Sequence, residues 1–175
     1  MEVKMNETTR TVTMKGNPLT LTGNELKVGD TAPEFEALAN DLTPVKLSSL
    51  KGRIRVISSV PSLDTPVCDI QTRRFNTEAA NLGTDVAILT ISMDLPFAQK
   101  RWCGAAGVDK VTTLSDHRGA EFGNSYGVLI KELRLLARAI FIVDQNGIIQ
   151  YIQIVEEISE EPDYDAVLEA VSRLV

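Results

Sequence analysis

One segment of the sequence combines a cysteine, a threonine and two prolines at a spacing that can activate a thiol. It runs Val60-Pro61-Ser62-Leu63-Asp64-Thr65-Pro66-Val67-Cys68. Proline is favoured at the first position of a helix, so Pro66 predicts a helix with Thr65 as its N-cap and Cys68 in its first turn. Unpaired N–H groups and the positive end of the helix dipole favour thiolate over thiol there. Because the thiolate is the nucleophile, Cys68 is a candidate catalytic residue.

Two other interpretations of Cys68 stay open from the residues alone. A free cysteine is often a small buried residue with a packing role. A dithiol of the Cys-x-x-Cys type needs a second cysteine at the start of the helix, and Thr65 stands in that place. The Thr65 hydroxyl can accept from a helix amide and donate to an approaching group. A thiolate beside it suits attack on an electrophilic oxygen better than disulfide exchange.

Arg138 and Cys103 could act together with Cys68. Arg138 precedes the apolar run 139–143, where a guanidinium is unfavourable unless it is paired or functional. The alternative is an arginine at the sheet edge that reaches solvent. Cys103 lies in a predicted second helix that begins near Asp94-Leu95-Pro96, where an acidic cap precedes a proline. Packing is the default role of a cysteine in such a helix.

The elements that must position these residues follow from hydrophobic periodicity. Residues 55–60 and 86–91 are short, apolar on both faces and rich in β-branched side chains, as buried strands are. Residues 66–82 between them have a helical pattern closed by Gly83, with Val67, Ile70 and Phe75 directed inward. Strand, helix and strand form a βαβ unit, whose two strands should be parallel.

The flanking segments add strands and helices to this unit. Alternation predicts an N-terminal β-hairpin over residues 11–22 that turns at Gly16-Asn17-Pro18, and a loop with Gly29, Pro33 and Pro44 as breakers follows. After the second helix we expect a strand at 111–114, a short helix at 119–126, a hairpin formed by 139–143 and 148–155, and a final helix from Pro162-Asp163. This order is typical of a thioredoxin-like α/β domain: a central mixed sheet flanked by helices. We expect residues 1–175 to form one such domain.

Composition excludes several classes of function. The sequence has 18 Lys and Arg and 24 Asp and Glu, a net charge of -6. We therefore expect neither nucleic acid nor an anionic membrane surface as a partner. No apolar run reaches the roughly 18–20 residues of a membrane-spanning helix. Residues 1–7 are polar, unlike a secretory signal, which favours the cytoplasm. Two cysteines and one histidine cannot complete a four-ligand zinc site unless carboxylates or a second chain help. No phosphate-binding glycine loop follows a strand, so nucleotide binding is not expected. We expect no metal and no cofactor, since a cysteine carries the candidate chemistry.

Pro61-x-x-x-Thr65-x-x-Cys68 resembles the peroxidatic signature of the peroxiredoxins. Together with the run from Asp94 through Pro96 to Trp102-Cys103, it is similar to the atypical two-cysteine subgroup, the bacterial thiol peroxidases. The similarity extends over essentially the whole chain. The first motif is fairly specific to peroxiredoxins, and the pair is highly specific to the subgroup. Trp102 stands where the subgroup leads us to expect phenylalanine.

The resemblance implies a role for each candidate. Cys68 would attack the O–O bond of hydrogen peroxide or an organic hydroperoxide and become a sulfenic acid. Thr65 and the Cys68 amide would hold the peroxide oxygens, Pro61 would shield the sulfur, and Arg138 would polarise thiolate and peroxide. Cys103 would be the resolving cysteine, forming a Cys68–Cys103 disulfide that thioredoxin then reduces. The resemblance also implies a homodimer.

Helix geometry adds one expectation about this disulfide. Cys103 would lie about eight residues along the second helix, roughly 12 Å from the sheet edge. A disulfide needs Cα atoms within about 7 Å of each other. We therefore expect local unwinding around Cys68 and Cys103, made easier by Gly104 and Gly107.

Two rival functions use the same residues. A thiol–disulfide oxidoreductase is disfavoured because Cys-x-x-Cys is missing. A peroxide sensor or redox-switched binding protein would oxidise Cys68 to change shape and bind a partner without sustained turnover. Outside these motifs, we expect His117 in a surface loop and the acidic residues between 156 and 161 on a solvated face.

Overall fold

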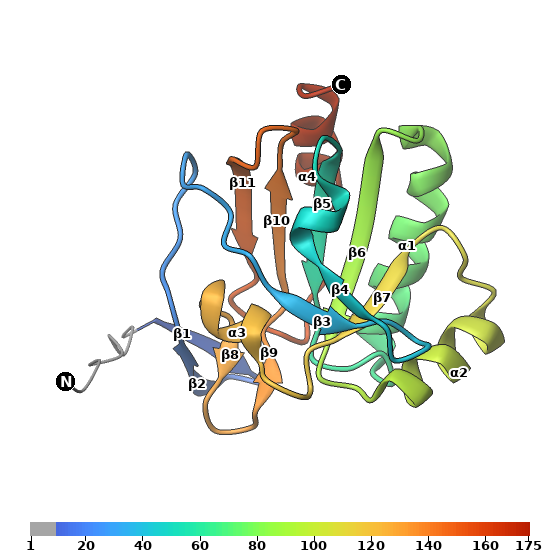
Figure 1. Ribbon diagram of the computed structural model, residues 1–175. Coiled ribbons are helices and arrows are strands. Elements are labelled where there is room, and N and C mark those ends of the chain that lie inside the picture. The colour runs from blue at the N-terminus through green and yellow to red at the C-terminus, as the bar shows by residue number, and fades with distance from the viewer. Residues whose placement is uncertain (1–9) are drawn as a thin grey trace.

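A seven-stranded mixed sheet forms the centre of the computed structural model, which describes residues 10–175 (Figure 1). Its strands are β3 (Glu36–Leu38), β4 (Pro44–Lys46), β5 (Ile54–Ser59), β6 (Val86–Ser92), β7 (Thr112–Ser115), β10 (Ala139–Val143) and β11 (Ile149–Ile154). They lie in the order β11-β10-β5-β6-β7-β3-β4. The predicted parallel pairing of β5 with β6 is confirmed, and β7 continues it in parallel. All other neighbours in this sheet are antiparallel.

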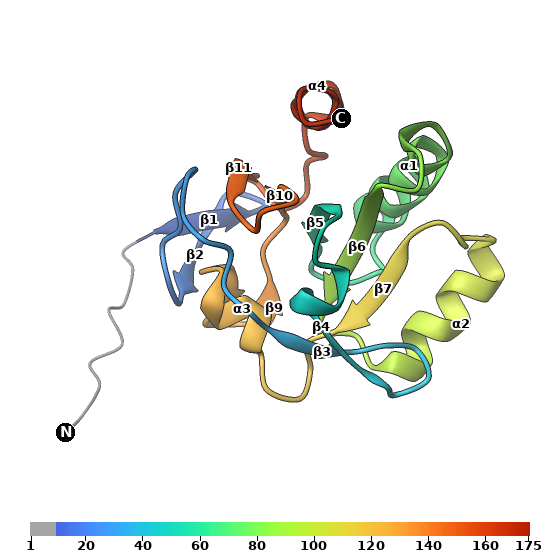
Figure 2. The same cartoon turned by 45° about the horizontal axis from the view of Figure 1, so that its top comes forward.

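Helices cover both faces of this sheet. The helical elements are α1 (Pro66–Leu82), α2 (Pro96–Ala106), α3 (Glu121–Ser125), α4 (Tyr164–Ser172) and the 3-10 helix η1 (Leu47–Leu50). Figure 2 shows α1, α2 and α4 on one side of the central strands and α3 on the other. The predicted bounds of the first helix are confirmed. Within residues 10–175, no helix has the length and apolar composition that crossing a bilayer requires.

The two-residue period of the strands divides the apolar side chains between two cores. Val56 and Ile140 pack with Phe75 of α1 and Val167 of α4. Their neighbours along the same strands point to the other face, and Ile57 belongs to the core beneath α3. Both faces of β5 and β10 are therefore buried, which explains their continuous apolar runs.

A second, smaller sheet lies on the α3 side and includes the predicted N-terminal hairpin. Its strands are β1 (Thr11–Met14), β2 (Asn17–Thr22), β8 (Leu129–Ile130) and β9 (Leu135–Leu136), in that order. The predicted turn at Gly16-Asn17-Pro18 is wrong, because Asn17 already pairs with Met14 and the turn consists of Lys15 and Gly16. Both residues have positive φ, 50° and 80°, as a two-residue hairpin turn requires. The expectation about residues 1–7 lies outside the described residues.

Two segments contain structure that the sequence did not predict. The expected loop between the hairpin and β5 contains β3, β4 and η1, and the short strands β8 and β9 follow α3. These strands are only two or three residues long. A run of that length carries no recognisable periodicity, so pairing with distant strands decides its conformation.

The inward face of α1 also differs from the prediction. Ile70 is half exposed rather than buried, and the buried positions are Cys68, Gln71, Thr72 and Phe75. Two of these four are polar, so counting apolar residues selected the wrong stripe of the helix. Gln71 is tolerated inside because its amide donates to Ser58 Oγ of β5 at 2.6 Å.

A buried carboxylate secures α3. Asp116 accepts hydrogen bonds from the backbone N–H groups of Phe122 at 3.1 Å and Gly123 at 2.9 Å. Burial raises the pKa of Asp116 to about 6, against the lowering effect of these two hydrogen bonds. Since the folded pKa lies above the unfolded value of 3.8, the folded protein holds the proton more tightly between these values.

The contribution of Asp116 to stability should therefore fall as the pH rises. We expect the free energy of unfolding to be on the order of 1 kcal/mol lower at pH 7 than at pH 5 from this group alone. Urea unfolding of the wild type and of Asp116→Asn across this range measures it. The variant should be less stable at both pH values, since an amide cannot accept both N–H groups, and should lose this pH slope. Equal slopes in the two proteins would contradict the assignment.

Candidate active site

Cys68 lies in the first turn of α1, at the carboxyl end of β5. Thr65 is the N-cap and Pro66 the first helical residue, as the sequence predicted. The Cys68 side chain is fully buried and packs in a small apolar cluster with Val60 and Leu63. The carboxyl ends of parallel strands are where α/β folds place their ligands, so the sulfur occupies a position suited to chemistry.

Arg138 lies directly against this sulfur. Its Nη2 donates to Cys68 Sγ at 3.2 Å and to the Ile158 carbonyl oxygen at 2.8 Å. Its Nε also donates to Ile158 at 3.1 Å, and Nη1 donates to Gln71 Oε1 at 2.6 Å. The side chain is 1% exposed, which excludes an edge arginine that reaches solvent. Within residues 10–175, Arg138 donates to two neutral oxygens and to the sulfur. Of these three partners, the sulfur is the one that can carry a compensating negative charge.

Gln71 and Ser58 complete the support of the guanidinium, and sequence reasoning missed both. Gln71 lies one helical turn after Cys68 and faces the same way, so one helix presents both acceptors to Arg138. Its amide is fixed by Ser58 of β5. Gln71 could have been found from its spacing: it lies three residues after Cys68, on the side of the helix that also carries Phe75.

The N-terminal hairpin supports the site from the other side. The Ile158 amide donates to the Thr13 carbonyl oxygen at 2.9 Å, while the Ile158 carbonyl oxygen accepts from Arg138. The Thr13 hydroxyl donates to the Glu157 carboxylate at 2.9 Å. Glu157, one of the acids expected on a solvated face, is partly exposed and also holds β1 beside the segment that orients Arg138.

Thr65 is oriented differently from the expectation. Its hydroxyl donates to the Ser62 carbonyl oxygen at 3.0 Å, so it is engaged with the loop and does not cap a helix amide. A four-residue turn from Ser62 to Thr65, in which the Thr65 amide donates to the Ser62 carbonyl oxygen at 3.2 Å, lets the side chain fold back on its own loop. Because the hydroxyl proton is already donated to Ser62, the Thr65 oxygen is available to a ligand only as a hydrogen-bond acceptor.

Asp94 fixes the loop that precedes Cys68, a role the sequence did not predict. It was expected to cap α2, but the N-cap of α2 is Leu95. One Asp94 oxygen accepts from Ser62 Oγ at 2.7 Å. The other accepts from Leu63 N at 2.8 Å and from Ser92 Oγ at 2.7 Å. The carboxylate thus ties the end of β6 to the loop that contains the peroxiredoxin-like motif.

Three predicted site residues line one pocket. Pro61, Thr65 and Arg138 face a pocket of about 300 Å³ whose walls are mostly apolar. The remaining lining residues come from the start of α1, from the hairpin and from the segment after β11: Pro66, Val67, Met14, Lys15, Ile158 and Ser159. Arg138 lines this pocket and also contacts the buried Cys68 Sγ, so its guanidinium lies between the pocket and the sulfur.

Cys103 does not reach this site. It lies half-buried in α2, with Sγ 3.4 Å from Thr113 Oγ1 of β7, and both cysteines are free. Cys68, in contrast, is placed over β5 and β10 by Gln71 and Arg138. Cys68 thus lies over β5 and Cys103 over β7, and these two strands are two strand spacings, or about 10 Å, apart.

Comparison with known proteins assigns the family. Residues 27–168 match the Redoxin family. The thiol peroxidase of Oceanobacillus iheyensis is 63% identical over 90% of this chain and 95% of its own length, and that of Bacillus subtilis is 57% identical over 94% and 98%. The chain therefore belongs to the Redoxin family and, within it, to the thiol peroxidases.

Solved structures show the same fold. The peroxiredoxin-like protein from Aquifex aeolicus superposes with a TM-score of 0.90 at 48% identity, covering 95% of this chain and 98% of its own. The thiol peroxidase from Chromobacterium violaceum shares the fold with a TM-score of 0.83 at 22% identity, covering 93% and 95%. The predicted thioredoxin-like α/β fold, a mixed sheet flanked by helices, is confirmed.

The support that Asp94 gives to the loop can be tested by Asp94→Asn. An amide has one acceptor oxygen for the three donors that meet the carboxylate, so at least one charge-assisted hydrogen bond is lost. We expect the variant to unfold with a free energy about 1.5–3 kcal/mol lower. We also expect slower oxidation of Cys68 by peroxide, because Pro61 and Thr65 would no longer be held in place. Urea unfolding and stopped-flow kinetics measure the two effects.

Asp64→Asn is the matched control. Asp64 belongs to the same loop and has the same charge, but its side chain is exposed. It should change neither stability nor the oxidation rate appreciably. If Asp94→Asn and Asp64→Asn behave alike, the hydrogen bonds of Asp94 do not hold the loop.

Proposed function

We propose that this protein is a peroxidase that reduces hydrogen peroxide and organic hydroperoxides with the thiol of Cys68. The observation that carries the proposal is the contact of Arg138 Nη2 with Cys68 Sγ at 3.2 Å, made by an arginine that lines one pocket with Pro61 and Thr65. A buried sulfur paired with a fixed cation, beside a small pocket, suits a small electrophile. The identity to thiol peroxidases supports the same activity.

In the first step, the Cys68 thiolate attacks one peroxide oxygen and the O–O bond breaks. Cys68 becomes a sulfenic acid, and the other oxygen leaves as an alkoxide or hydroxide that takes up a proton. Charge moves from the sulfur to the leaving oxygen during this step, and the Arg138 guanidinium stays close to both. A preorganised cation in a dry site stabilises such a transition state more than water can.

Thr65 and the start of α1 are placed to hold the peroxide. The Thr65 hydroxyl donates to Ser62, so its lone pairs can accept the proton of a hydroperoxide. The backbone N–H of Cys68, in the first turn of α1, can donate to a peroxide oxygen. Pro61, which lines the pocket, keeps water from the sulfur.

In the second step, the Cys103 thiol displaces hydroxide from the Cys68 sulfenic acid. A Cys68–Cys103 disulfide and one water molecule form. A dithiol reductant, thioredoxin, then reduces this disulfide by thiol–disulfide exchange and restores both thiols. Over one cycle the hydroperoxide becomes an alcohol and water, and thioredoxin becomes its disulfide.

The pocket wall favours hydroperoxides with an organic group. Met14, Pro66, Val67 and Ile158 offer apolar surface, while Arg138 and Thr65 provide the polar end. An apolar substituent placed against this wall is removed from water, which adds binding free energy that hydrogen peroxide lacks.

Three further properties belong to this proposal. We place the protein in the cytoplasm because recycling of the disulfide needs a reducing compartment. We propose a homodimer on the strength of the family resemblance. We also propose that the chain acts as one domain, because Val12 and Leu21 of the hairpin share a core with Phe141 of the central sheet.

Thioredoxin-coupled consumption of cumene hydroperoxide by the wild type, Cys68→Ser and Cys103→Ser tests the proposal. The wild type should turn over repeatedly. Cys68→Ser should have no activity above background, because the nucleophile is missing. Cys103→Ser should react once with peroxide and lose its recycling by thioredoxin.

Two outcomes would contradict the proposal. Full activity of Cys68→Ser would show that another group reduces the peroxide. A wild type that is oxidised once and then stalls in the presence of thioredoxin would instead favour a peroxide sensor or a redox-switched binding protein.

A further inference from the structure

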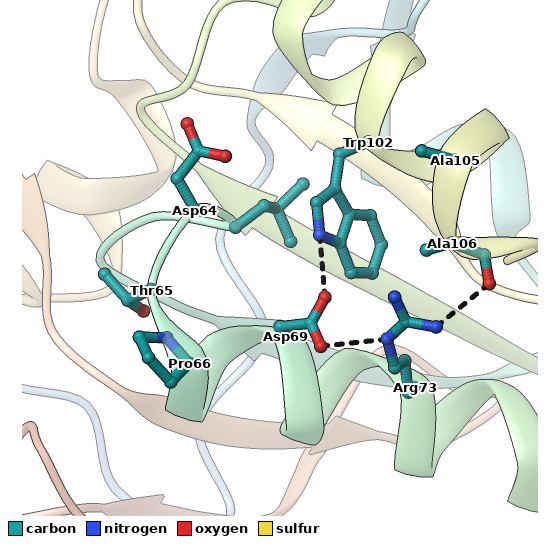
Figure 3. A pocket seen from close by; sticks show the side chains of 9 residues that line it. Asp64, Thr65, Pro66, Asp69, Arg73, Trp102, Ala105 and Ala106 are labelled. Atoms are coloured by element: carbon teal, nitrogen blue, oxygen red, sulfur yellow. Dashed lines mark hydrogen bonds and ion pairs between the residues drawn. The ribbon is translucent and has the colours of Figure 1, made fainter.

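A polar contact joins α1 to α2 (Figure 3). Trp102 Nε1 donates to Asp69 Oδ1 at 2.9 Å, and Arg73 Nε donates to Asp69 Oδ2 at 2.8 Å. Arg73 Nη1 also donates to the Ala106 carbonyl oxygen at 3.1 Å, near the end of α2. We call Asp69, Arg73 and Trp102 the interhelix latch.

The latch connects the immediate neighbours of both cysteines. Asp69 follows Cys68 in α1, and Trp102 precedes Cys103 in α2. The Trp102 ring packs on the apolar cluster that contains the Cys68 side chain. The Arg73 guanidinium lies 5.8 Å from the centre of that ring. One hydrogen bond, from Trp102 to Asp69, thus fixes the first turn of α1 to the middle of α2.

Disulfide formation requires this arrangement to change. The strands beneath the two cysteines, β5 and β7, are about 10 Å apart across the sheet, whereas the sulfurs of a disulfide are about 2 Å apart. Cys103 faces Thr113 of β7, and the Trp102 ring covers the cluster around Cys68. Cys103 therefore approaches Cys68 only after the segment with Trp102 leaves α1.

We propose that the interhelix latch sets the rate at which Cys103 reaches the oxidised Cys68. Asp69, Arg73 and Trp102 are positioning residues: they hold α2 against α1 and so delay the step that follows the reaction with peroxide. This inference rests on the proposed function. The step they delay is the attack of the Cys103 sulfur on Cys68–SOH, which forms the S–S bond and releases water.

The latch is built to open at modest cost. Asp69 and Arg73 are both partly exposed, with 32% and 49% of their side chains accessible, so water can replace their hydrogen bonds when the helices part. Gly107, with φ of 68°, ends α2 next to Ala106. The latch residues also line an open surface groove of about 370 Å³, so water has access to their hydrogen bonds.

A delayed resolving step has a chemical consequence. While Cys68–SOH waits for Cys103, a second hydroperoxide can oxidise it to a sulfinic acid, with the hydroperoxide reduced to an alcohol. A stronger latch thus favours inactivation at high peroxide, and a weaker latch favours the disulfide. The same three residues control both the rate of recycling and the tolerance of excess peroxide.

Trp102→Phe is the variant that tests this inference. Phenylalanine keeps an aromatic ring over the Cys68 cluster but removes the donor to Asp69. In single-turnover stopped-flow experiments we expect disulfide formation after peroxide addition to accelerate about threefold to tenfold, the effect of one lost hydrogen bond. Mass spectrometry should show a proportionately smaller sulfinic fraction at high peroxide. The rate of the first oxidation, measured with Cys103→Ser in the background, should remain the same.

Asp69→Asn and Glu78→Gln provide the comparison. Asp69→Asn weakens the ion pair with Arg73 and should also accelerate disulfide formation. Glu78 forms an equivalent ion pair with Arg74 on α1, at 3.0 Å, and the Arg74 guanidinium lies over Tyr164 of α4 rather than beside α2. Glu78→Gln should therefore leave the resolving rate unchanged, even if it lowers the stability of the helix by a similar amount.

The outcomes separate this inference from the proposed function. A wild type that forms no disulfide after peroxide addition would overturn the proposed function itself. If the wild type forms the disulfide but Trp102→Phe and Asp69→Asn resolve at the wild-type rate or more slowly, the latch does not control the step. Equal acceleration by Glu78→Gln would assign the effect to general weakening of α1 and overturn the inference as well.

Discussion

The pairing of a buried guanidinium with a buried sulfur is the interaction on which the rest of the structure depends. Arg138 is 1% exposed and Cys68 is fully buried, and a charge taken out of water is strongly unfavourable unless its partners replace the lost hydration. The fold supplies those partners from two segments: the Ile158 carbonyl oxygen after β11, and the Gln71 amide oxygen and the sulfur on one face of α1. The hairpin positions Ile158, α1 carries Gln71 and Cys68, and the central sheet supplies Ser58, which orients Gln71.

The same constraint explains why the two halves of the reaction need different conformations. A rigid, dry pocket around Arg138 and Cys68 suits the attack on peroxide, because its dipoles are already aligned. The resolving cysteine must then enter that pocket from a position over β7, which a rigid site forbids. Two features meet these different needs. Asp94 holds the loop before Cys68 firmly, whereas the contacts that attach α2 to α1 are partly exposed to water.

Sequence reasoning could predict the parts that local patterns encode. The bounds of α1, the parallel pairing of β5 with β6 and the place of Cys68 in the first helical turn follow from apolar runs and from Pro66. The spacing of Gln71 from Cys68 marks the face of α1 on which it lies, but not its distant partner Arg138. Asp94 and Glu157 show no such local sign, because their partners Leu63 and Thr13 are distant in the chain. The short strands β3, β4, β8 and β9 were missed for a related reason, since their pairing partners rather than their own residues determine them.

The rate at which hydrogen peroxide oxidises Cys68 in Arg138→Lys tests the central claim most directly, with Cys103→Ser in the background of both proteins. Lysine keeps the charge but cannot reach the sulfur, Gln71 and Ile158 at once. The account predicts a fall of about tenfold to a hundredfold in the second-order rate constant, with the fold retained by circular dichroism. A rate constant equal to that of the parent protein would contradict it, because the hydrogen-bonded guanidinium would then have no part in the attack on peroxide.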